Sequence, residues 1–183
     1  MTSLLDRATL RRSYERSAET YDVRFRDVQR EKFAVMLAGG VPLGRAPWLD
    51  LGCGTGLLAA YLAERGHDPH ALVGLDFSRA MLARARARGL AAAEGEIDVL
   101  PFRDAAFGAV LAFTSLRIVS DPESERRTLA EIGRVLAPGG VFVLTVLRAS
   151  HDSSLAAALQ AAGFQFGPAC GCGQDVGYRC VRA

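Results

Sequence analysis

The chain has 183 residues, half of them apolar, and a formal net charge of +2. A chain of this length and composition can bury one hydrophobic core, so we expect a single folded unit. The small net charge excludes the strong basic field that favours nucleic acids or anionic membranes. No apolar run is long enough for a transmembrane helix, and the first residues are polar and charged rather than a signal peptide. A soluble cytoplasmic protein is therefore expected.

Two helical patterns occupy residues 4–38 and break near residues 20–22. The first is rich in charge and has only a thin apolar stripe, so it should pack marginally on the rest of the molecule. We expect residues 1–40 to form an N-terminal helical segment and residues 41–183 to form the main part of a single domain. Lys32 is the only lysine among 22 basic residues, which we interpret as a composition bias because the arginines are scattered over several helices.

A glycine-rich turn follows the first predicted strand. This strand ends near Asp50, and Gly52, Gly54 and Gly56 follow with G-x-G-x-G spacing before a helical run. Glycine lets a ligand lie directly against the backbone, and such a loop at the carboxyl end of a parallel strand is typical of nucleoside-binding folds. Asp76 ends a second apolar strand, where a carboxylate can accept hydrogen bonds from both ribose hydroxyls.

The spacing of the loop separates two ligand classes. The dinucleotide fingerprint, G-x-G-x-x-G, has one more residue before its last glycine than this loop has. Asp50 also stands two residues before the first glycine, where it would repel a pyrophosphate. A ligand that carries an ammonium and a sulfonium suits this acid better.

These ordered motifs resemble those of the class I S-adenosylmethionine-dependent methyltransferases. The likeness includes residues 50–56, the Gly-Glu-Ile-Asp-Val-Leu-Pro-Phe segment at 95–102 and the Leu-Ala-Pro-Gly-Gly turn at 136–140, and it covers roughly residues 14–147. The resemblance implies an α/β fold with a Rossmann-like, seven-stranded, mostly parallel sheet, a C-terminal antiparallel hairpin and helices on both faces. It also implies an enzyme that uses S-adenosylmethionine.

The resemblance assigns residues to the cofactor. It implies that the N-terminal helical segment folds over the cofactor as a lid, that Asp76 binds the ribose, and that Glu96 accepts a hydrogen bond from the adenine amino group. The backbone N–H of Ile97 would donate to an adenine nitrogen. The full set of expected cofactor-binding residues is Tyr21, Asp50, Gly52, Cys53, Gly54, Gly56, Asp76, Phe77, Met81, Glu96, Ile97 and Phe113.

For several of these side chains two interpretations stay open. Tyr14 and Tyr21 either border the methyl-donor pocket or are ordinary helix-packing aromatics. Phe77 and Met81 either contact the adenine or belong to the core.

The segment after the fourth predicted strand should face the departing methyl group. Arg117 stands where many relatives have a polar pair; it could bind a carboxylate or phosphate, or lie on the surface. Gly108 replaces the aspartate usual at the start of this strand, a difference that we interpret as structural. No histidine or carboxylate is placed to act as a base, so the catalytic residues stay unknown.

Three cysteines crowd the C-terminus. Cys170, Cys172 and Cys180 could bind zinc or a soft substrate such as trivalent arsenic, or they could be small strand residues in a reducing cytosol. His67 and His70 lie in a polar loop at the other edge of the sheet. We predict no metal site.

Together these features predict an S-adenosylmethionine-dependent methyltransferase that acts on a small-molecule acceptor by in-line transfer. No strong nucleic-acid signal and no membrane segment is present. Two alternatives stay open: a protein or RNA methyltransferase whose arginine-rich first helix contacts a macromolecule, and a non-catalytic S-adenosylmethionine-binding regulatory protein. The sequence does not specify the acceptor or the oligomeric state.

Overall fold

The computed structural model describes residues 7–39, 43–116 and 122–183, so that Arg117 and part of the link at residues 40–42 lie outside the described residues. Its α-helices are α1 (Arg7–Ser17), α2 (Tyr21–Met36), α3 (Leu57–Ala63), α4 (Arg79–Ala87), α5 (Pro122–Val135) and α6 (Ser153–Ala161), with 3-10 turns η1 (Pro69–Ala71) and η2 (Arg148–Ser150). Its strands are β1 (Trp48–Leu51), β2 (Leu72–Asp76), β3 (Ala91–Glu94), β4 (Phe107–Phe113), β5 (Leu136–Leu147), β6 (Phe164–Phe166), β7 (Cys170–Cys172) and β8 (Asp175–Arg182).

One sheet organises the molecule. Its strand order is β3-β2-β1-β4-β5-β8-β6, and the first five strands are parallel. β8 runs antiparallel to β5, β6 and β7. The expected Rossmann-like, mostly parallel sheet with a C-terminal antiparallel hairpin is confirmed. The strand order reverses between β1 and β4, which is where such sheets bind ligands.

The C-terminal hairpin holds one strand more than we expected. β7 pairs with the start of β8 through Cys170 and Gly177, whereas β6 pairs with the end of β8 through Phe164 and Arg182. The predicted connection between two strands is therefore itself partly a strand, and the sheet has eight strands rather than seven.

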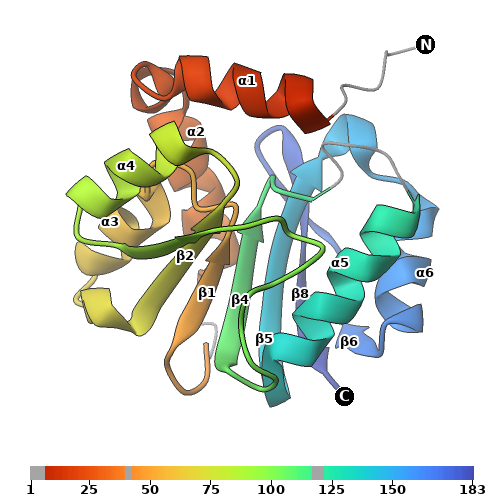
Figure 1. Cartoon of the computed structure of the whole chain (residues 1–183). Helices are drawn as coiled ribbons and strands as arrows, with labels where there is room; N and C mark the ends of the chain where they lie inside the picture. The colour runs from red at the N-terminus through yellow and green to blue at the C-terminus, as the bar shows by residue number, and fades with distance from the viewer. Residues whose placement is uncertain (1–6, 40–42, 117–121) are drawn as a thin grey trace.

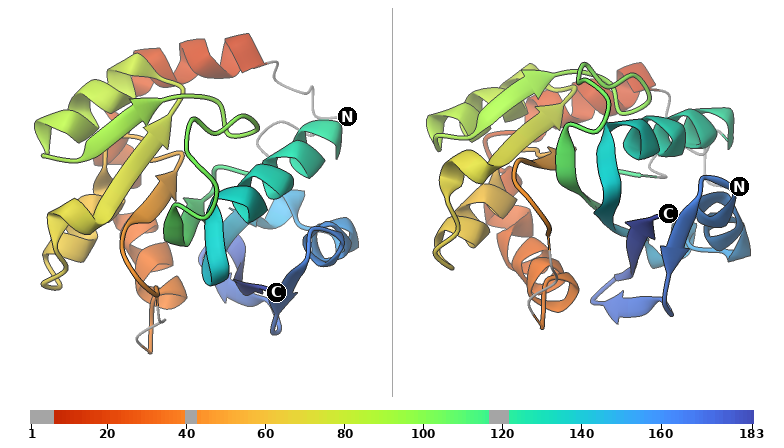
Figure 2. Two further views of the ribbon diagram at one scale, coloured as in Figure 1. Left: turned by 60° about the horizontal axis from the view of Figure 1, so that its bottom comes forward. Right: turned by 90° about the horizontal axis from the view of Figure 1, so that it is seen from below.

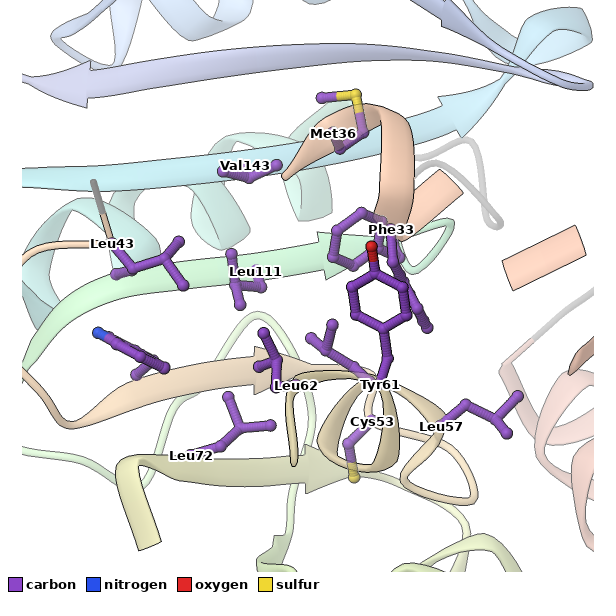
Figure 3. Close-up of a cluster of buried hydrophobic side chains, with 14 of the residues drawn as sticks. Phe33, Met36, Leu43, Cys53, Leu57, Tyr61, Leu62, Leu72, Leu111 and Val143 are labelled. Atoms are coloured by element: carbon purple, nitrogen blue, oxygen red, sulfur yellow. The ribbon is translucent and has the colours of Figure 1, made fainter. Parts of the chain in front are cut away.

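Helices cover both faces of the sheet (Figures 1 and 2). Successive strand residues point to opposite faces, so Trp48 joins one core cluster while Leu49 and Leu51 join the other. The first cluster lies under α2, α3 and α4, and Figure 3 shows its side chains. The second lies under α5 and α6.

The two N-terminal helices play different structural parts. α1 lies across the ends of the strands at the top of Figure 1 and buries none of its own residues. α2 buries Phe33 and Met36 in the first core cluster. Only α1 thus has the position of a detachable cover, and the second half of α2 belongs to the core.

The start of β5 differs from the expectation. The Pro-Gly-Gly sequence at 138–140 was expected to separate a helix from a strand at 141–147, but the strand begins directly after α5, at Leu136. Leu136 pairs with Phe107, and the register then shifts before Ala109. The predicted turn is therefore an irregularity inside the strand, which Gly139 permits with a φ of 70°.

Gly108 has the structural role that we expected. A Cβ at this position would lie 1.9 Å from the carbonyl oxygen of Arg45. Its N–H donates to the carbonyl of Pro47 over 3.0 Å. The close approach of these two backbones leaves no room for the aspartate that the family usually carries here.

The three C-terminal cysteines do not converge. Cys172 packs in the first core cluster and Cys180 in the second, on the opposite face of the sheet. The Sγ of Cys170 lies 3.3 Å from the Sδ of Met36. The hypothesis of a three-thiolate site is therefore wrong, and the described residues hold no other group of three or more potential ligands arranged for a metal ion.

None of the helices within the described ranges combines the length and the apolarity needed to cross a bilayer.

Candidate functional site

A cavity of about 430 Å³ lies at the carboxyl ends of the central strands, beneath α1. This volume is in the range usual for small-molecule sites. Eight of the residues expected to bind the cofactor belong to its wall: Tyr21, Gly52, Gly54, Asp76, Phe77, Glu96, Ile97 and Phe113. A void of about 30 Å³ adjoins it, shares several of these residues, and is also lined by Asp50 and Cys53.

The glycine loop connects β1 to α3 at the floor of this cavity. Gly52 has a φ of 80°, and a Cβ there would lie 2.5 Å from the Cβ of Ser115. Gly54 has a φ of 51° with open space where a Cβ would stand. Gly52 thus permits close packing of two loops, and Gly54 presents bare backbone to a ligand.

Asp76 is held in place by the backbone. Its carboxylate accepts hydrogen bonds from the N–H groups of Gly54 at 2.9 Å and Ser78 at 2.8 Å. Burial raises the pKa of Asp76 although these bonds work in the opposite direction. The carboxylate is therefore fixed beside the glycine loop, with lone pairs left for a ligand.

Asp50 is a buried acid beside the glycine loop. It alternates with Leu49 and Leu51 along β1, so its side chain points to the face that α2 and α3 cover. Burial, together with the charge of Asp76, raises the pKa of Asp50 to about 8. A cation in the adjoining void would relieve both effects.

Helix α1, part of the segment expected to act as a lid, is tied to the far side of the cavity by ion pairs. Arg11 donates to Glu96 over 2.7 Å, and its guanidinium also lies over the ring of Phe77, 5.5 Å from the centroid. Arg7 donates to both oxygens of Asp98, at 2.6 and 3.1 Å. The hydrogen bonds from Arg7, with a smaller contribution from Arg127, lower the pKa of Asp98 to about 2 against the effect of burial.

Glu15 fixes the other end of α1. Its two carboxylate oxygens accept from the backbone N–H groups of Arg79 at 2.7 Å and Ala80 at 3.2 Å. These are among the first N–H groups of α4, which have no partner inside their own helix. Ser78 caps the same helix by accepting from the backbone N–H of Met81.

Four of the expected residues are not in the wall of the main cavity: Asp50, which lines the small void, and Met81, Gly56 and Cys53. Met81 has no exposed surface, Gly56 begins α3 with a left-handed φ of 83°, and Cys53 lines only the small void. Burial raises the pKa of the Cys53 thiol, which excludes a thiolate. A Cβ at Gly56 would lie 3.2 Å from Ala85, so this glycine serves helix packing.

The two lid tyrosines lie against each other in the wall. The rings of Tyr14 and Tyr21 are 6.3 Å apart, and Tyr14 meets Phe77 edge to face at 5.8 Å. Burial raises the pKa of Tyr21 to about 12. Its hydroxyl accepts from Gln29 over 3.4 Å. A tyrosine that keeps its proton at neutral pH can bind a ligand but is no general base.

Asp22 connects α2 to the glycine loop. It accepts from the hydroxyl of Thr55 over 2.6 Å and pairs with Arg88, which also donates to the carbonyl of Thr55. Burial opposes the charge of Asp22, but the hydrogen bonds from Arg88 and Thr55 outweigh it and lower its pKa. Asp22 lies in the predicted helical region at residues 4–38, and the sequence did not indicate that it would bind Thr55 and Arg88.

A second polar cluster, which the sequence did not indicate, lies at the ends of β4 and β5. Lys32 from α2 contacts Asp175 from β8, and both belong to the cavity wall. Thr114 and Thr145 donate to the same carboxylate oxygen of Asp175, at 2.6 and 2.9 Å. Thr114 has a φ of 57°, an uncommon value for a residue other than glycine and one that often marks functional sites.

One signal could have pointed to Lys32. The other 21 basic residues of the chain are arginines. A composition bias towards arginine therefore does not explain why position 32 carries a lysine, and this exception was informative. Asp175 gives no comparable signal, because an acid two residues after Gly173 is typical of an ordinary turn.

Comparison with known proteins agrees with this geometry. Residues 49–144 match the family described as Methyltransferase domain. The chain is 44% identical over 126 residues to the demethylmenaquinone methyltransferase of Thermus thermophilus. The alignment covers 64% of this chain and 54% of that protein. It is 32% identical over 162 residues to the malonyl-[acyl-carrier protein] O-methyltransferase of Pectobacterium atrosepticum. This second alignment covers 87% of this chain and 61% of that protein. The chain thus spans little more than half the length of these curated relatives.

The fold also matches solved structures. An S-adenosylmethionine-dependent methyltransferase from Thermotoga maritima superposes with a TM-score of 0.73 and 21% identity, over 93% of this chain and 98% of that one. At this level of identity the match concerns the fold alone. Since the family match covers more than half of the chain and the sheet order and glycine loop agree with it, the chain belongs to the class I S-adenosylmethionine-dependent methyltransferases.

Proposed function

We propose that this protein transfers a methyl group from S-adenosylmethionine to a small, largely apolar acceptor. The observation that carries the proposal is the pair of buried carboxylates, Asp50 and Asp76, beside an open glycine loop. Each has a pKa that burial raises, and the charge acting on Asp50 is that of another carboxylate. Such a site favours a cationic ligand over a phosphate.

The residues at the ends of β1, β2 and β3 fit this cofactor, and we call this part of the cavity the cofactor half. Asp76 would bind the ribose hydroxyls and Asp50 the ammonium group, while Gly54 lets the ligand approach the backbone. Phe77, Ile97 and Glu96 line the side expected for the adenine. S-adenosylmethionine supplies an activated methyl group, so the protein needs to align the two reactants and exclude water.

Glu96 would exchange partners when the cofactor binds. In this structure it accepts from Arg11 of the lid helix, and its side chain is 39% exposed. An adenine amino group would share or replace this contact. Binding of the cofactor and closure of α1 should therefore influence one another.

A macromolecular acceptor is less well supported. Arg7 of α1 lines the cavity, Arg11 lies one turn further along the same helix, and both are engaged by carboxylates of the same chain. An arginine neutralised in this way contributes little to binding RNA phosphates. We also propose that the protein works in the cytoplasm, since all four of its cysteines are free thiols.

Calorimetric titration tests the proposal. The protein should bind S-adenosylmethionine and S-adenosylhomocysteine with micromolar affinity and should not bind NAD. Asp76→Ala should weaken both by on the order of 1–3 kcal/mol, because buried ribose hydroxyls would lose a charged acceptor. Asp68→Ala, in the exposed loop before β2, is the matched control and should bind normally. Equal binding by the Asp76 and Asp68 variants, or tight binding of NAD, would contradict the proposal.

A further inference from the structure

Lys32 places a cation at the strand ends where we expect the methyl acceptor. Its side chain is 5% exposed, yet it belongs to the wall of the main cavity. Its Nζ lies 2.7 Å from the hydroxyl oxygen of Thr114 and 3.0 Å from Oδ2 of Asp175. An ammonium has three protons, so at least one has no partner among the residues that the structure describes.

Several neighbouring polar atoms also have unused hydrogen-bonding capacity. The buried side-chain oxygens without a partner in the described part of the chain are Oε1 of Gln29, Oγ of Ser115 and Oδ1 of Asp175. All three residues line the same cavity as Lys32. Buried polar atoms are almost always hydrogen-bonded, so these three oxygens around one cavity favour binding of a polar group there.

We propose that Lys32, with Ser115 beside it, binds an oxygen of the methyl acceptor, and that the acceptor is a phenol or enol on an apolar frame. This inference rests on the proposed function and names the acceptor class for it. Lys32 donates a hydrogen bond through its remaining N–H to the acceptor oxygen. Asp175 and Thr114 hold the ammonium in place. We call these residues the acceptor half of the cavity.

The charge balance of the cluster favours a hydroxyl over a carboxylate. Asp175 is fully buried and already compensates the charge of Lys32. The nearby thiol of Cys172 adds no charge, because burial and the carboxylate of Asp175 raise its pKa to about 11. A full carboxylate on the acceptor would thus enter a nearly neutral site without a free counterion.

The rest of the wall favours an apolar frame. Phe113 and Leu116 are buried beside Ser115, and Phe25, Val28 and Leu147 border the same cavity. Val28 and Leu147 keep about two-fifths of their surface exposed. An aromatic ring would cover these side chains while its oxygen contacts Lys32.

A pair of probes tests the inference. In the full chain saturated with S-adenosylhomocysteine, 4-nitrophenol should bind at least tenfold tighter than 4-nitroanisole, its methyl ether, at one fixed pH. This comparison needs no variant.

The charge-neutral double variant Lys32→Met with Asp175→Asn should bind both probes equally, while Arg30→Gln removes a charge from the same helix and should keep the preference. Arg30 pairs with Glu64 rather than with the cluster. Equal binding by the unmodified protein, failure of both probes to bind, or a preference that survives the double substitution would overturn the inference alone. Failure of S-adenosylhomocysteine to bind would overturn the proposed function, and the inference with it.

Discussion

The cofactor half and the acceptor half of the cavity differ in whether their buried carboxylates are paired with a cation. In the cofactor half, burial raises the pKa of both Asp50 and Asp76, the charge of Asp76 adds to the effect on Asp50, and no cation of the described residues forms an ion pair with either. In the acceptor half, Asp175 is fully buried but has a lysine and two threonine hydroxyls as partners. The first half is completed by a cationic ligand, whereas the second already holds its own counterion. This difference explains why one cavity can select two ligands of unlike charge.

The largest expected effect comes from removing the counterion of the acceptor half. Lys32→Met leaves Asp175 buried and unpaired, so the free energy of unfolding should fall by about 3–5 kcal/mol. Adding Asp175→Asn should recover at least half of this loss, because the buried charge disappears. Urea denaturation measures both variants. A double variant no more stable than Lys32→Met would show that the two residues are not coupled.

In the cofactor half, a substitution of Asp50 should raise the free energy of unfolding, by less than the loss expected for Lys32→Met. The pKa of Asp50 rises from 3.8 to about 8 on folding, so between these pH values the folded protein binds the extra proton and its stability falls as pH rises. Asp50→Asn removes this penalty. Without ligand, the variant should be more stable than the unmodified protein at pH 8, by on the order of 2 kcal/mol, and the gap should narrow towards pH 4.

Denaturation curves at several pH values measure this gap. Asp27→Asn, an exposed position on α2, serves as the control and should leave the pH dependence unchanged. The same Asp50→Asn variant should bind S-adenosylmethionine more weakly. A variant that is less stable at pH 8 would contradict the assignment of Asp50 as an uncompensated acid.

The smallest effect is expected at the lid. The pair between Arg11 and Glu96 is about 40% exposed on both sides, so Arg11→Ala should cost less than about 1 kcal/mol of stability. Stopped-flow measurements should show S-adenosylhomocysteine leaving two- to fivefold faster. Arg12, exposed on the same helix and bonded to Thr9, provides the control. If Arg12→Ala speeds release as much, the contact to Glu96 has no special role.

The two halves also differ in how much of them could be predicted. The glycine loop, Asp50 and Asp76 follow a local rule, in which a parallel strand ends in an acid and a tight turn, so their sequence spacing placed them at one edge of the sheet. Lys32, Thr114 and Asp175 lie on three elements separated by 61 or more residues, and no local pattern connects them. Only the packing of α2 against β8 brings them together.

The predictions that failed or shifted have local physical reasons. For Met81 two interpretations were open, and its position on α4 favours the core, because its side chain has no exposed surface. The start of β5 was not predicted, because a Pro-Gly-Gly sequence ordinarily ends a helix or strand. Here it forms an irregularity within the strand. The cysteine hypothesis failed because adjacent strands present alternating residues to opposite faces of the sheet.

Helix α2 reaches both halves of the cavity. Asp22 near its first residue bonds to Thr55 of the glycine loop, and Lys32, ten residues later and about 15 Å along the axis, belongs to the acceptor half. A single helix attached at both places moves as one body. We therefore expect thermodynamic communication between the two ligands, in which occupancy of either half changes the affinity of the other by the same factor. Binding of an acceptor to Lys32 would in this way change the affinity of the protein for the methyl donor.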